Sequence, residues 1–257
     1  MRGLAVFSIR NILLLTIGTL TFLITVLVGK EVFVQWGNLS GVESLKEASL
    51  IEDNLFDVGE KLAAERHISF SILHSPDRAA IRSLETSLKK SRQESDAMFA
   101  AALVLLNRYK FSGLQAEIRI VNDRFKAMQA LRPEIDHAVS LPIAKRDPAV
   151  SDRWFRDSTA AVTQTQRIWA GIIKDFIDVD PVVNAQMRFK YFLWTAMEYT
   201  GRERSMIGRL IAEDVAPTHH EQALLLRWQG FADYFWGSVD RVADQSQLGH
   251  VLMPYLK

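Results

Sequence analysis

The residues with the clearest chemical potential are two Glu-Arg pairs, Glu65-Arg66 and Glu203-Arg204. Arginine carries a planar fork of N–H donors that matches carboxylates and small oxyanions. The positions three, four and seven residues from each arginine are mostly apolar, so on a helix both arginines would point into a core. A buried guanidinium without a partner costs several kcal/mol, so each arginine needs a carboxylate or an anion.

Two interpretations of these pairs stay open. In the first, the four charged side chains bind each other and fix the register of the helices. In the second, Arg66 and Arg204 keep free donors and bind a small oxyanion or carboxylate, with the two glutamates in support. Arg202 is a third candidate ligand residue, but it lies four residues after Glu198, which favours an ion pair on the helix surface.

The composition argues against several function classes. Lys and Arg total 31 against 30 Asp and Glu, and this balance gives no reason to expect a nucleic-acid partner. The absence of cysteine excludes disulfides, thiolate catalysis and cysteine metal sites. The chain contains no H-E-x-x-H, glycine-rich phosphate loop or G-x-S-x-G motif. We therefore expect no enzyme, no cofactor and no metal.

An uncharged apolar run at residues 11–29 predicts a transmembrane helix, since about 19 such residues cross a bilayer. Basic residues precede this run, whereas the charges of Lys30 and Glu31 cancel after it. The positive-inside rule then puts residues 1–10 in the cytoplasm and residues 30–257 outside. A secretory signal peptide is the alternative, but a poor cleavage site follows the run. We expect a single-pass inner-membrane protein with its bulk in the periplasm.

The remainder of the chain has a helical pattern, because apolar residues recur at spacings of three and four and no strand pattern occurs. Breaks that contain proline or glycine separate the segments. We therefore expect an all-α fold, an up-and-down bundle of about six long helices after the membrane helix. These helices span about residues 30–74, 76–108, 114–139, 148 onward, 181–213 and 217–244. The first helix is long enough to form a stalk or to pair with a second chain, and we expect a homodimer.

Two motifs, A-E-R-x-x-S at 64–69 and E-Y-T-G-R-E-R-S-M-I-G at 198–208, resemble the arginine-bearing helices of nitrate- and nitrite-sensing (NIT) domains. Those domains are all-helical extracytoplasmic sensors in bacterial methyl-accepting chemotaxis proteins and related signalling proteins. The segment with Arg146-Asp147-Pro148 and Arg153-Trp154-Phe155 is similar to the middle of such domains. The resemblance covers roughly residues 50–244.

The resemblance implies that arginines on the first and fifth helices contact the anion, here Arg66 and Arg204, with Arg202 as a weaker third. This chain has His67 where a glycine often follows the arginine. The implied function is a membrane-anchored chemoreceptor sensor domain for nitrate, nitrite or a small carboxylate. The first helix would carry a change in packing to the membrane.

The alternative is a membrane-anchored structural or oligomerising bundle without a small ligand. Chemoreceptors usually continue through a second membrane helix into a cytoplasmic signalling module, and this sequence has neither. We therefore expect a truncated receptor, a fragment or a stand-alone anchored binding protein.

Overall fold

The computed structural model describes residues 46–245 except for 109–112 and 176–180. The chain divides into two units, residues 1–47 and residues 48–257, and the described helices belong to the second apart from residues 46 and 47. Within the described ranges no helix is long and apolar enough to cross a membrane. The transmembrane helix expected at residues 11–29 lies outside the described residues.

Six α-helices and no strand occur in the described part of the chain, which confirms the all-helical prediction. Proline opens α4 and α5 at their first position, where its missing N–H costs nothing. The helices are a first helix at 46–74, then α2 (Arg78–Arg108), α3 (Gln115–Ser140), α4 (Pro148–Asp175), α5 (Pro181–Glu213) and α6 (His219–Gln245), with a short 3₁₀ turn η1 (Ile143–Lys145) before α4.

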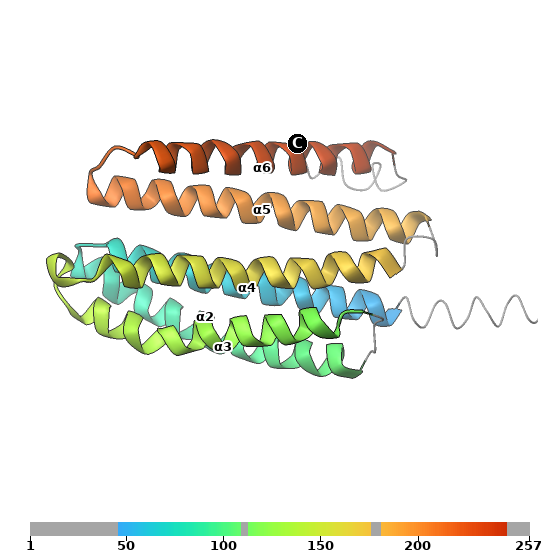
Figure 1. The fold of residues 1–257 in the computed structure, drawn as a ribbon, viewed down its shortest axis with the longest axis horizontal. Helices are drawn as coiled ribbons and strands as arrows, with labels where there is room; N and C mark the ends of the chain where they lie inside the picture. Colours follow the sequence, from blue (N-terminus) through green and yellow to red (C-terminus); the bar gives the residue numbers. More distant parts are fainter. Residues whose placement is uncertain (1–45, 109–112, 176–180, 246–257) are drawn as a thin grey trace, which may run out of the picture. The chain divides into compact units, whose positions relative to one another are not determined.

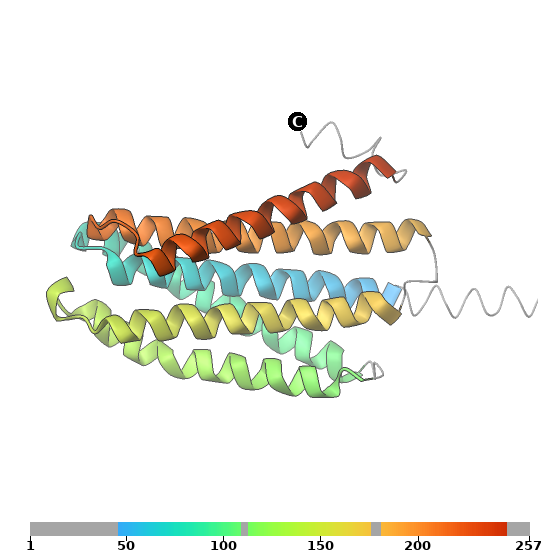
Figure 2. The same cartoon turned by 45° about the horizontal axis from the view of Figure 1, so that its top comes forward.

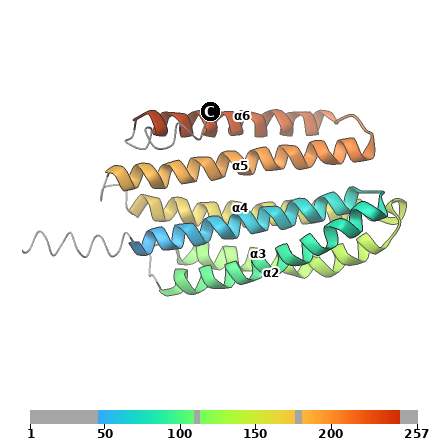
Figure 3. The same ribbon diagram turned by 180° about the vertical axis from the view of Figure 1, so that it is seen from behind.

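The helices of the bundle lie side by side in an up-and-down order. The 46–74 helix and α4 lie in the middle, with α2 and α3 on one side and α5 on the other (Figures 1 and 3). α6 is outermost, where it packs on α5 and is inclined to it (Figure 2). The 46–74 helix is therefore covered by neighbours on both sides.

Two buried faces on the 46–74 helix explain its central place. Side chains at alternating spacings of four and three residues form the first face, and none is more than 2% exposed: Ile51, Leu55, Val58, Leu62, Glu65, Ser69 and Ile72. Residues seven apart form the second face, also buried: Glu52, Gly59, Arg66 and Leu73. Glu65 and Arg66 thus occupy core positions on different faces.

Side chains that cap helix ends fix one end of the bundle, where the 46–74 helix ends and α2 begins. Asp77 caps α2 by accepting a hydrogen bond from the backbone N–H of Ala79 at 2.7 Å. The Nη1 atom of Arg146 donates to the carbonyl oxygens of Ile72, Leu73 and Ser75 at 2.8–3.1 Å. These bonds satisfy the last carbonyls of the 46–74 helix and tie it to the connection between α3 and α4.

Aromatic side chains join the 46–74 helix, α4 and α5 nearer the other end. The ring centroids of Phe56 and Trp194 lie 5.9 Å apart, and those of Trp169 and Trp194 lie 5.0 Å apart. The Trp169 indole N–H donates to the buried Glu52 carboxylate. Gly59 lies directly against Trp194, since a Cβ atom at that glycine would fall 1.9 Å from its Cζ2 atom. This close packing sets the separation of the 46–74 helix and α5.

Candidate functional site

Glu65 faces α2 and α3, where it is completely buried. Its two carboxylate oxygens accept hydrogen bonds from Nε and Nη2 of Arg132, each at 2.8 Å. The Ser95 hydroxyl donates a third bond at 2.9 Å. Burial alone would lower the pKa of Arg132, but the bonds and charges of Glu65 and Asp96 raise it above the usual value. Glu65 is therefore fully committed to an ion pair inside the bundle.

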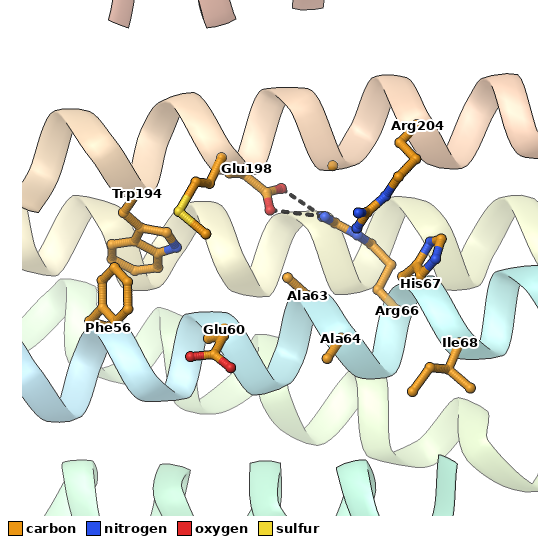
Figure 4. A pocket seen from close by; sticks show the side chains of 12 residues that line it. Phe56, Glu60, Ala63, Ala64, Arg66, His67, Ile68, Trp194, Glu198 and Arg204 are labelled. Atoms are coloured by element: carbon orange, nitrogen blue, oxygen red, sulfur yellow. Dashed lines mark hydrogen bonds and ion pairs between the residues drawn. The ribbon is translucent and has the colours of Figure 1, made fainter. Parts of the chain in front are cut away.

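Arg66 faces the opposite side, toward α4 and α5, and is 1% exposed. Its Nη1 and Nη2 atoms donate to the two carboxylate oxygens of Glu198 at 2.6 and 2.9 Å (Figure 4). Nη1 also donates to the Thr159 hydroxyl at 3.0 Å, and the guanidinium lies 5.5 Å from the centre of the Phe155 ring. The Nε–H is buried and has no hydrogen-bond partner among the residues that the structure describes. Arg66 therefore keeps its Nε–H donor unused within the described residues.

Glu198 joins two arginines on the inner side of α5. Besides binding Arg66, it accepts a hydrogen bond from Nε of Arg202 at 2.7 Å. Burial would raise the pKa of Glu198, but the charges of Arg66 and Arg202 lower it below the usual value. Arg202 also donates to the Thr163 hydroxyl of α4 at 2.9 Å. These bonds hold a charged cluster between the 46–74 helix, α4 and α5.

Arg204 lies at the surface of α5, although the sequence analysis put it in the core. The apolar neighbours that suggested a core face, Met197, Ile207 and Ile211, are 40–74% exposed themselves. No hydrogen bond or ion pair is recorded for Arg204 within the described residues. Its charge is therefore not neutralised by a neighbouring carboxylate.

A cavity of about 360 Å³ lies between part of the 46–74 helix and α5. Arg66 and Arg204 both line it and point toward the same part of it (Figure 4). The rest of its wall combines apolar, acidic and imidazole groups: Phe56, Glu60, Ala63, Ala64, His67, Ile68, Trp194, Met197, Glu198 and Gly201. Two guanidinium groups in one cavity, one without a carboxylate partner, can bind a small anion.

The partners expected for the two Glu-Arg pairs differ from those observed. The four side chains do not pair with each other in the described part of the chain, because Glu65 binds α3 and Arg66 binds Glu198. Glu203 is half-buried and does not line the cavity. Arg202 does pair with Glu198, but the pair is buried, with only 9% of Arg202 exposed, rather than on the surface.

The residues that complete the two buried clusters could not be predicted from the sequence. Arg132, Ser95 and Thr159 lie on other helices, and no local spacing links them to the Glu-Arg pairs. The burial of Glu65 could have been predicted from the sequence, because Glu65 continues the heptad-like spacing of the buried apolar side chains on its helix. Its burial makes a basic partner on another helix necessary.

Comparison with known proteins identifies the family. A family model described as nitrate and nitrite sensing (NIT) matches residues 57–252, which include all three candidate arginines and every residue of the cavity wall except Phe56. No curated protein and no solved structure matches the chain. The match covers most of the sequence, and the chain therefore belongs to the NIT family of helical nitrate- and nitrite-sensing domains.

Proposed function

We propose that this domain detects nitrate or nitrite in the cavity between the 46–74 helix and α5. The observation that carries the proposal is the convergence of Arg66 and Arg204 in that cavity, where Arg204 has no acidic partner among the described residues. Nitrate and nitrite are small planar oxyanions that accept forked hydrogen bonds from guanidinium groups. The unused Nε–H of Arg66 adds a donor. Family membership supports this ligand class, and no catalytic step is needed.

Anion binding would act on helix packing through Arg66. Arg66 belongs to the 46–74 helix and already binds Glu198 of α5, so an anion at Arg66 changes an interaction that joins these two helices. A ligand shifts such an equilibrium only by its difference in affinity for the two packings. The anion competes with Glu198 for Arg66, so its affinity should differ between a packing in which Arg66 binds Glu198 and one in which it does not.

Membrane anchoring and receptor context are part of the same proposal. The apolar run at residues 11–29, with basic residues before it, supports a single-pass inner-membrane protein whose bulk is periplasmic. We place the domain in a chemotaxis receptor or a related signalling protein, as a homodimer. Exposed apolar side chains on α5, among them Met197, Ile207 and Ile211, support a protein contact there. Protease digestion of spheroplasts tests the periplasmic location, and sedimentation equilibrium tests the homodimer.

Calorimetry of the full-length chain with sodium nitrate and sodium nitrite tests the ligand. Arg204→Gln should weaken binding by about tenfold to a hundredfold, because a hydrogen bond to a charged group contributes about 1.5–3 kcal/mol. It should leave the melting temperature unchanged, since Arg204 is exposed and forms no bond to any other residue in the described ranges. Arg167→Gln is the matched control, an exposed arginine on α4 outside the cavity. Equal affinity in both variants would remove Arg204 from the site.

The alternative function is a structural bundle that binds no small ligand. One observation favours it: Glu198 already occupies both Nη atoms of Arg66. This alternative predicts no heat of binding with either anion in the wild-type protein. It also predicts that formate and small carboxylates leave the melting temperature unchanged.

A further inference from the structure

His67 is a titratable residue of the cavity that the proposed function does not yet use. It follows Arg66 on the same helix, is half-buried, and lines the cavity together with Arg66 and Arg204 (Figure 4). Its Nδ1 atom lies 3.3 Å from the Ser205 hydroxyl oxygen of α5. Its Nε2 atom has no recorded hydrogen-bond partner in the described chain.

The hydrogen bonds of Ser205 fix the tautomer of this histidine. The Ser205 hydroxyl donates its proton to the carbonyl oxygen of Gly201 at 2.8 Å. Toward His67 the hydroxyl can therefore only accept, so Nδ1 carries the ring proton in the neutral form. Nε2 then carries a lone pair, which would repel an anion bound beside it. Protonation at Nε2 converts this acceptor into a donor and gives the ring a positive charge.

The charged groups around the ring oppose this protonation while the cavity holds no anion. Burial lowers the pKa of His67 below 6.5, and the charges of Arg204 on α5 and Arg66 on its own helix lower it further. Within the described residues, Arg204 and Arg66 are the only charged side chains that shift the pKa of the ring. Glu198 also lines the cavity, but its charge is balanced by Arg66 and Arg202. Glu60, the remaining acidic residue of the wall, is exposed.

We propose that the cavity takes up its oxyanion together with a proton, and that Nε2 of His67 is the atom that receives it. The inference rests on the proposed function, since the anion supplies the negative charge that the ring lacks. His67 then becomes a third cationic donor beside Arg66 and Arg204 and sets the dependence of affinity on pH. Affinity rises as the pH falls from the pKa of the anion-bound ring toward the lower pKa of the free ring.

Calorimetry of the full-length protein with sodium nitrate at several pH values between about pH 5 and pH 8 tests this coupling. The charge of nitrate is constant over this range, so any change in affinity comes from the protein. Affinity should fall by up to about tenfold per pH unit above the pKa of the free ring. Titrations in two buffers of different ionisation enthalpy should give up to one proton taken up per nitrate bound.

Two variants assign the proton to His67. His67→Asn keeps an N–H donor at the position of Nδ1, and His67→Gln keeps a polar group near that of Nε2. Both should bind nitrate with one weak affinity at all pH values, near that of the wild type at high pH, without proton uptake. His219→Gln, an exposed histidine of α6, should keep the wild-type profile.

The outcomes separate this inference from the function on which it rests. Nitrate binding without pH dependence, or pH dependence that persists in both His67 variants, overturns the role of His67 and leaves the anion site standing. In the second case the proton would enter at another group, such as His74, which binds Glu213 and Ser151 outside the cavity. Absence of nitrate and nitrite binding in the wild type at every pH overturns both proposals.

Discussion

Glu65 and Arg66 are adjacent in the chain, yet they bind partners on opposite sides of their helix. Successive residues of an α-helix are rotated by roughly 100°, so a helix buried on two faces can carry one charge on each. Glu65 binds Arg132 of α3, and Arg66 binds Glu198 of α5. This single dipeptide therefore ties the central helix to both of its flanking layers.

Replacing Glu198 by glutamine should destabilise the fold strongly. The substitution removes the charge that balances Arg66 and Arg202, and breaking a buried pair in this way costs about 3–5 kcal/mol. Urea unfolding of the two proteins measures the difference. Glu94→Gln on the surface of α2 is the control and should cost less than about 1 kcal/mol. A small effect for Glu198→Gln would mean that the arginines find other partners.

Glu52 should make stability depend on pH. Burial raises its pKa from 4.5 to about 7, so between these values the folded protein holds a proton that the unfolded chain has released. The free energy of unfolding should therefore fall as the pH rises from 4.5 to about 7. At about 1.4 kcal/mol per pKa unit, the total loss is about 3 kcal/mol. Glu52→Gln keeps an acceptor for Trp169 and should remove this loss. Urea unfolding at low and high pH compares the two proteins, and equal pH dependence would contradict the prediction.

At the scale of elements, the packing of α5 explains two wrong predictions. Arg204 was predicted in the core but is exposed, whereas Arg202 was predicted at the surface but is buried. The side of α5 with Met197, Ile207 and Ile211 is exposed, whereas its buried side carries polar and charged residues such as Glu198 and Arg202. Helical periodicity locates a face, but only the neighbouring helices decide which face is covered. Arg204 consequently lies at the edge of the cavity and Arg202 lies inside the bundle.

Gly59→Ala should destabilise the contact between the 46–74 helix and α5. Alanine favours helix over glycine by about 1 kcal/mol, but its Cβ would fall 1.9 Å from Trp194. Overpacking of this kind costs about 1–3 kcal/mol, so a net loss is expected in thermal unfolding. Gly208→Ala on α5 is the matched control and should stabilise, because in the described chain its added Cβ would meet nothing within 4 Å beyond its own helix backbone and chain neighbours. Stabilisation by both substitutions would show that Trp194 can move aside.

At the scale of the whole bundle, α6 should open more easily than the central helix. It lies outermost on α5 (Figure 1). Most of its side chains are exposed or half-buried. The 46–74 helix is buried on two faces and bonded to α2, α3, α4 and α5. Amide hydrogen exchange should therefore be faster in α6 than in residues 51–73. Equal protection of both would indicate that the bundle opens only as one unit.

The sequence by itself determined the helical class and the positions of most breaks, because periodicity and proline act locally. It also identified both Glu-Arg pairs and placed Arg66 in the core, where it is found. Only the tertiary structure decided which charges meet: Arg132 and Glu198 come from helices far along the chain, and no local spacing brings them to Glu65 and Arg66. Packing between helices likewise decided the cavity, because its two walls belong to segments more than a hundred residues apart.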